Sequence, residues 1–198
     1  MFDIITFGSA TKDILVRPKN VTILKYGKSA GSGADVCLPL GSKIDVDSIE
    51  FHTGGGGTNT AATFAKQGFK TAFCGMIDSD SSARELLNAL KKFKINTSLV
   101  LKTNKKPTNQ SIIIFSENQD RTILVYRGAS ELMDSKSIPW DQLKSEWLYL
   151  APLSGLLCDS FGELVDFAVK NNIKIAANPG IAQLSLPNFT EIAKKINI

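Results

Sequence analysis

The sequence is poor in the side chains that most often bind metals or act as nucleophiles. It has one histidine, His52, and three cysteines that lie far apart, Cys37, Cys74 and Cys158. It has no C-x-x-C pair, and His52 has no base or nucleophile near it in the sequence, which argues against a zinc site, a disulfide framework and histidine-dependent nucleophilic catalysis. We therefore expect a reduced, cytoplasmic protein in which Cys74 is an inert core thiol and His52 packs at a strand end.

Neither charge nor hydropathy suits nucleic-acid binding or insertion into a membrane. The 23 basic residues exceed the 19 acidic ones by four, but no dense basic block stands beside stacking aromatic residues. No apolar run approaches the length of a membrane-spanning helix, and the N-terminus opens like a strand instead of a basic leader. With 198 residues, 43% of them hydrophobic, the chain is long enough to bury the core of one domain.

Short apolar runs alternate with helical patterns. Residues 3–7, 70–76 and 173–177 have the continuous apolar character of buried strands. This alternation predicts the α/β class, with a parallel sheet covered by helices on both faces. Trp140 and Trp147 are expected to pack a loop onto this sheet.

Two capping-box patterns mark the expected helix starts. Ser82 stands three residues before Glu85, and Ser160 three residues before Glu163, each within an apolar helical pattern. In such a box the serine side chain bonds the main-chain N–H three residues later.

Two further segments look like hairpins outside the main sheet. Residues 14–52 are β-prone but interrupted by glycine and proline. Residues 109–115 and 122–126 are also strand-like, and the polar stretch 116–120 between them has the length of a hairpin link. We expect both segments to form one flap.

The most informative motif is the glycine run Thr53-Gly54-Gly55-Gly56-Gly57-Thr58-Asn59-Thr60, followed by an alanine-rich helical pattern. Glycine lets main-chain N–H groups approach a ligand, and a helix start offers further donors to electronegative oxygens. The alternatives are a tight turn without a ligand and, for Asn59, a simple helix cap. We favour an oxygen-rich ligand.

Two familiar nucleotide motifs fail on spacing. A G-x-G-x-x-G frame that begins at Gly54 meets Asn59 where its last glycine belongs. A Walker A loop that ends at Gly27-Lys28-Ser29 has Thr22 in place of its first glycine. A dinucleotide-dependent oxidoreductase is therefore disfavoured.

Together these motifs resemble the ribokinase/PfkB family of carbohydrate kinases. The segment 54–61, which begins with the four glycines, is followed by Gly68 and Gly75 at the family's spacing. The segment 8–13, which ends in Asp13, resembles the family's substrate-binding start, and residues 127–130 resemble its Gly-Ala-Asn turn. The resemblance extends over nearly the whole chain.

The resemblance implies a Rossmann-like three-layer parallel sheet with a small β lid, formed by about 14–52 and 109–126, within a single partial domain over 1–198. It also implies ATP-dependent phosphorylation, with Mg²⁺, of a hydroxymethyl group on a sugar or nucleoside. The family includes homodimers that pair through the lid. The substrate-binding residues implied are Thr11, Asp13, Gly54, Gly55, Gly56 and Asn59.

The sequence also departs from the family. The C-terminal Asp-Thr-x-Gly-Ala-Gly-Asp motif, which supplies the catalytic base and an anion hole, is absent, so no catalytic residue is assigned and ATP and Mg²⁺ have no site here. We expect a C-terminally truncated kinase that is inactive alone; the alternative is a non-catalytic module of this fold that binds a polyol or a partner. Gly56 stands where phosphosugar kinases of the family often have lysine, which favours an unphosphorylated substrate. Asp78 and Ala83 replace glycines of the family's Gly-x-Asp-x-x-Gly turn.

Overall fold

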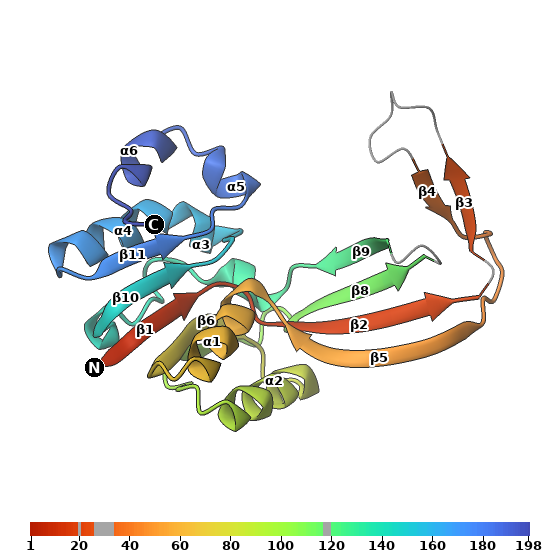
Figure 1. Cartoon of the computed structure of the whole chain (residues 1–198), viewed down its shortest axis with the longest axis horizontal. Coiled ribbons are helices and arrows are strands. Elements are labelled where there is room, and N and C mark those ends of the chain that lie inside the picture. The colour runs from red at the N-terminus through yellow and green to blue at the C-terminus, as the bar shows by residue number, and fades with distance from the viewer. Residues whose placement is uncertain (20, 26–33, 117–119) are drawn as a thin grey trace. The chain divides into compact units, whose positions relative to one another are not determined.

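The computed structural model describes residues 1–19, 21–25, 34–116 and 120–198 (Figure 1). These residues form two compact units. The first contains Met1–Lys12, Thr53–Asn109 and Arg127–Ile198, and the second contains Asp13–His52 and Gln110–Tyr126. Residues 27–29, where the failed Walker A frame ends, and most of the expected link 116–120 lie outside the described residues.

A five-stranded sheet with the order β11-β10-β1-β6-β7 forms the centre of the first unit. Neighbouring strands run parallel, which confirms the predicted parallel sheet. The strands are β1 (Phe2–Phe7), β6 (Thr71–Ile77), β7 (Val100–Lys102), β10 (Ser145–Leu150) and β11 (Lys174–Ala177). Trp147 lies within β10, so the expectation that it packs a loop was wrong.

Side chains of β6 are buried on both faces of the sheet. Phe73 and Ile77 belong to one core cluster, whereas Ala72, Cys74 and Met76 belong to the other. Because successive side chains of a strand point to opposite faces, burial on both sides requires the continuous apolar run seen in the sequence. Cys74 is fully buried, as predicted, and desolvation raises the pKa of its thiol.

Helices cover the sheet from both sides. In Figure 1, α1 (Gly56–Lys66) and α2 (Ser81–Lys92) lie on one face, and α3 (Leu156–Asp159) and α4 (Phe161–Lys170) on the other. The remaining helical segments are α5 (Ile181–Leu184), α6 (Phe189–Ala193) and the 3₁₀ turns Ala129–Leu132 and Trp140–Gln142. No helix of the described ranges is long and apolar enough to cross a membrane.

The helix caps differ from the two predicted capping boxes. The N-cap of α2 is Asp80, whose carboxylate accepts from Ala83 N–H at 2.7 Å, and not Ser82. Ser160 does precede α4, but its hydroxyl donates to the Leu156 carbonyl at 3.0 Å and caps nothing. Both boxes were therefore wrong in their bonding, although both helices exist.

Asp80 also ties the start of α2 to a distant segment. Its carboxylate accepts from the Thr108 N–H and from the Thr108 hydroxyl, both at 2.9 Å. Burial raises the pKa of Asp80, but the bonds from Ala83 and Thr108 outweigh this and leave it below its ordinary value. Neither Asp78 nor Ala83 has positive φ, so this turn does not need the family's glycines.

The second unit contains a four-stranded sheet with the order β5-β2-β8-β9. Its strands are β2 (Thr11–Pro18), β5 (Val46–Gly54), β8 (Asn109–Phe115) and β9 (Arg121–Tyr126). Strands β8 and β9 pair antiparallel, with Phe115 opposite Arg121, as predicted for a hairpin. A separate antiparallel pair is formed by β3 (Thr22–Lys25) and β4 (Ala34–Cys37).

Replacing Asp80 by alanine should lower the free energy of unfolding by about 1–3 kcal/mol, because it removes the cap and leaves the Thr108 N–H without its acceptor. Ser82→Ala, at the position that the sequence pattern favoured, should change it far less. The pKa of Asp80 is depressed in the folded protein, so its contribution is present above the ordinary value of 3.8 and is lost as the pH falls below it. Thermal unfolding of both variants from pH 7 to pH 3 tests this; equal effects of the two would contradict it.

Candidate functional site

The glycine loop packs its backbone directly against the carboxyl end of β1. Gly57 N–H donates to the Ser9 carbonyl at 3.1 Å, and Gly56 N–H donates to the Ser9 hydroxyl at 3.2 Å. The Thr6 hydroxyl donates to the Gly57 carbonyl at 3.0 Å. Two of the N–H donors at the start of α1 are thus used inside the fold, which leaves fewer for a ligand than the sequence suggested.

Steric contacts explain why the loop requires glycine. A Cβ on Gly57 would lie 2.7 Å from the Phe73 ring and 3.0 Å from the backbone of Gly8. Gly55 has φ of +106°, and a Cβ there would lie 2.4 Å from the Ser9 carbonyl oxygen. Helix–strand packing therefore accounts for these glycines, and a ligand contact by Gly54 or Gly55 stays a prediction.

A small polar hollow lies at the carboxyl ends of β1 and β10, where open parallel sheets bind ligands. Its volume is about 20 Å³, which suffices for roughly one water molecule. A sugar does not fit in this hollow alone. Its lining residues are Gly8, Ser9, Arg127, Ser130, Pro152, Leu153, Ser154 and Leu157.

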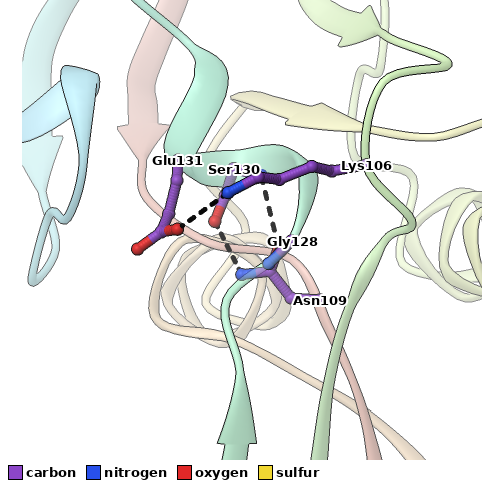
Figure 2. Close-up of polar contacts among 5 residues, drawn as sticks. All are labelled: Lys106, Asn109, Gly128, Ser130 and Glu131. Atoms are coloured by element: carbon purple, nitrogen blue, oxygen red, sulfur yellow. Dashed lines mark hydrogen bonds and ion pairs between the residues drawn. The ribbon is translucent and has the colours of Figure 1, made fainter.

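The turn after β9 is held by a side chain that the sequence reasoning did not single out. Figure 2 shows Asn109 beside this turn: its amide donates to the Ser130 hydroxyl at 2.6 Å, and its carbonyl oxygen accepts from the N–H groups of Gly128 and Ser130 at 3.1 and 3.2 Å. The ion pair between Lys106 and Glu131, at 3.4 Å, lies next to it. Ser130 stands in the sequence where the Gly-Ala-Asn turn has its asparagine, and Asn109 brings a carboxamide into contact with Ser130 from another segment.

The other predicted residues of the first unit lie at different depths. Thr11 is buried at the start of β2. Asn59, in the first turn of α1, is exposed and lines a hollow of about 210 Å³ between α1 and α2. The other residues that line this hollow are Thr53, Thr58, Ala62, Leu86, Ala89, Leu90 and Phe93.

Asp13 lies in the second unit, on β2, between polar neighbours. Burial raises the pKa of its carboxyl, whereas a hydrogen bond from the Ser111 side chain and the charge of His52 act in the opposite direction. His52 does not pack at a strand end as expected. Its side chain is 53% exposed on β5, and its Nε2 lies 3.1 Å from the Glu50 carboxylate.

The residues present do not fit a triphosphate with its metal. The loop donors of Gly56 and Gly57 already bond Ser9. Within the described ranges there is no group of three or more His, Cys, Asp or Glu residues that could hold a metal ion. No step of a phosphoryl transfer is therefore assigned to residues of this chain.

The family match and the curated relatives of this chain point to the same protein family. Residues 32–194 match the family described as pfkB family carbohydrate kinase. Ribokinase of Haemophilus influenzae is 26% identical over 151 residues, which cover 73% of this chain and 47% of the relative. The chain thus spans about half the length of the curated relatives it matches.

Solved structures share the fold at low identity. Arabidopsis thaliana ribokinase complexed with ribose and ATP has a TM-score of 0.69 and 18% identity, over 88% of this chain and 52% of that one. A nucleoside kinase of Methanocaldococcus jannaschii, an archaeal member of the ribokinase family, has a TM-score of 0.72 and 17% identity, over 98% and 59%. These likenesses show the ribokinase-like fold.

Replacing Gly57 by alanine should destabilise the protein by about 1–3 kcal/mol, because the new methyl group overlaps the Phe73 ring and the Gly8 backbone. Gly162→Ala is the matched control. Gly162 is the second residue of α4, where a Cβ would be 3.4 Å from Ile192, so alanine should leave stability unchanged or raise it by up to roughly 0.5–1 kcal/mol. Chemical denaturation measures both, and a neutral Gly57→Ala would refute the packing explanation.

Proposed function

The chain belongs to the pfkB family of carbohydrate kinases, and on this premise we propose that the whole protein is an ATP-dependent kinase for a hydroxymethyl group of a sugar or nucleoside. Its substrate is proposed to be unphosphorylated, because Gly56 stands in place of a lysine. It is proposed to work in the cytoplasm, where its three free cysteines would stay reduced.

The environment of Asp13 is the observation that carries this proposal. The carboxylate is partly desolvated, and the side chains that act on it among the described residues are the Ser111 hydroxyl and the His52 imidazole. Such a carboxylate gains hydrogen bonds when a ligand brings hydroxyl donors. A many-hydroxylated substrate supplies them.

Each predicted residue has a proposed role toward that substrate. Asp13 accepts from hydroxyl groups, and Asn59 offers both a donor and an acceptor. Gly54 and Gly55 supply main-chain contacts where a side chain would block approach, and Gly56, whose N–H bonds Ser9, contributes by leaving room beside them. Thr11, which is buried, positions the start of β2.

The catalytic base and the site for ATP and Mg²⁺ are proposed to lie on polypeptide outside these 198 residues. An uncovered apolar hollow of about 650 Å³ on the sheet supports this. It is lined by strand side chains such as Ile4, Tyr149 and Ala176 and by Phe64 of α1. Further polypeptide that packed here would bury surface that water otherwise contacts.

A protein made from the complete reading frame should phosphorylate at least one member of a panel of pentoses, hexoses and nucleosides when ATP and Mg²⁺ are supplied. The 198-residue chain should not, because it lacks a base and an anion hole. Coupled ADP release with mass spectrometry of the product measures both. If the complete protein transfers phosphate to none of them but still binds a polyol in calorimetry, a binding module replaces the kinase.

A homodimer through the second unit is also proposed. Ser111 and Asp13 share one face of the sheet, and Ser111 pairs with Val125, so Ile112 and its partner Leu124 share the other face. By the same alternation, Ile49 and Phe51 lie opposite the face of His52. This second face therefore carries a row of exposed apolar side chains from Ile49, Phe51, Ile112 and Leu124, as a self-complementary interface would.

Two neighbouring residues test the dimer. Leu124 is 53% exposed on the apolar face, and Val125 is 54% exposed on the Asp13 face. In the complete protein, Leu124→Asp should give monomers, because each copy would place a charge in the interface, whereas Val125→Asp should remain dimeric. Light scattering after size exclusion measures the mass. Identical behaviour of the two variants would exclude this face as the interface.

A further inference from the structure

Asp13 has a polar neighbour on each of the two strands beside it. In the sheet order β5-β2-β8, His52 comes from β5, Asp13 from β2 and Ser111 from β8. Both neighbours interact with the Asp13 carboxylate, which places the three side chains on one face. Ser111 is 8% exposed, so its hydroxyl is fixed in place among its neighbours.

The side chains of Asp13, Ser111 and His52 offer mainly hydrogen-bond acceptors to a ligand. The Ser111 hydroxyl donates its proton to Asp13 and keeps its lone pairs. His52 Nε2 must donate to the Glu50 carboxylate, 3.1 Å away, since a carboxylate only accepts. In the tautomer that this bond requires, Nδ1 is an acceptor whenever the ring is unprotonated. A row of acceptors across three strands, roughly 10 Å wide, suits a ligand that brings several O–H donors.

Few other charges face this row within the second unit. Glu50 and His52 stand on β5, and Arg17 lies further along β2, stacked over the Phe115 ring at 4.6 Å. Strand β8 contributes no titratable side chain, and β9 contributes Arg121 opposite Phe115. Among the described residues, the positive charge that acts on Asp13 is that of the His52 ring in its protonated form.

We propose that His52 and Ser111 act with Asp13 as one acceptor row, and that these two neighbours determine which hydroxyl pattern of the substrate is accepted. This inference rests on the proposed function, because it assigns the row to the sugar or nucleoside of that kinase. It adds two specificity-determining residues to the ones that the sequence motifs indicate.

The test uses the complete protein and whichever sugar or nucleoside it phosphorylates best. Ser111→Ala should lower kcat/KM by about tenfold to a hundredfold, mainly through KM. The variant loses the hydroxyl that bonds the Asp13 carboxylate and that offers its lone pairs to the substrate. His52→Gln should act in the same direction. Ser111→Thr keeps the hydroxyl and should restore most of the affinity. Thr122→Ala, on the opposite face of the sheet, should change nothing.

The pH profile separates this role from a purely structural one. The bond from Ser111 and the charge of His52 both lower the pKa of Asp13. Ser111→Ala and His52→Gln should therefore each move the acid limb of kcat/KM to higher pH, and Thr122→Ala should not. His52 is exposed, so His52→Gln reads out the proposal even if Ser111→Ala fails to fold.

Deoxy analogues of the substrate complete the design. For the analogue that lacks the hydroxyl bound by Ser111, the penalty of Ser111→Ala should vanish, as a double-mutant cycle between enzyme and ligand requires. If the protein phosphorylates a sugar but both variants keep the wild-type KM and acid limb, the acceptor row is refuted and the kinase stands. If it phosphorylates nothing, the kinase fails, and sugar affinities of the same variants by calorimetry then decide the row separately.

Discussion

The contact between the glycine loop and the end of β1 is the constraint on which the first unit depends. At Gly57 the start of α1 comes so close to Gly8 and Phe73 that no side chain fits between them. Ser9 uses both its carbonyl and its hydroxyl to hold the loop. Because α1 and α2 share one core cluster with β6, the same contact also sets how this layer packs on the sheet.

This arrangement changes the physical meaning of the glycine motif. A run of glycines before a helix is commonly taken as a cradle for an anion. Here two of its donors are satisfied within the fold, and the hollow beside it has room for about one water molecule. We therefore propose that the selection of a polyol depends on side chains, above all on the Asp13 carboxylate and its neighbours in the second unit.

Much of the fold could be predicted because it depends on local pattern. Strands β1, β6 and β11 have continuous apolar runs, and the hairpin β8–β9 was visible in its two β-prone segments. Strand β10 was missed because Ser145 and Glu146 interrupt its apolar character, and β7 because it has three residues. The cap of α2 was misplaced because the Asp80 carboxylate is also held by hydrogen bonds from Thr108, 28 residues away. A local sequence pattern contains no sign of that contact.

The candidate site likewise contains residues that a local sequence pattern marks and residues that depend on distant partners. The glycine loop and Asp13 were proposed as site residues from sequence because the family motif marks them, and their roles stay predictions. Ser9, Asn109 and Ser111 were not, because their partners lie far along the chain: Ser9 bonds Gly56 over 47 residues, and Asn109 bonds Ser130 over 21. Polar residues that interrupt an apolar strand, such as Ser111 before three isoleucines, were the one available signal.

Titration of the Asp13 carboxyl by NMR, in the complete protein labelled with ¹³C at aspartate carboxyls, tests the central claim most directly. Without sugar, burial should hold its pKa above the ordinary value of 3.8. A saturating sugar substrate should lower that pKa, because hydroxyl donors stabilise the charged form. A pKa of Asp13 that stays the same when the sugar binds would contradict the account.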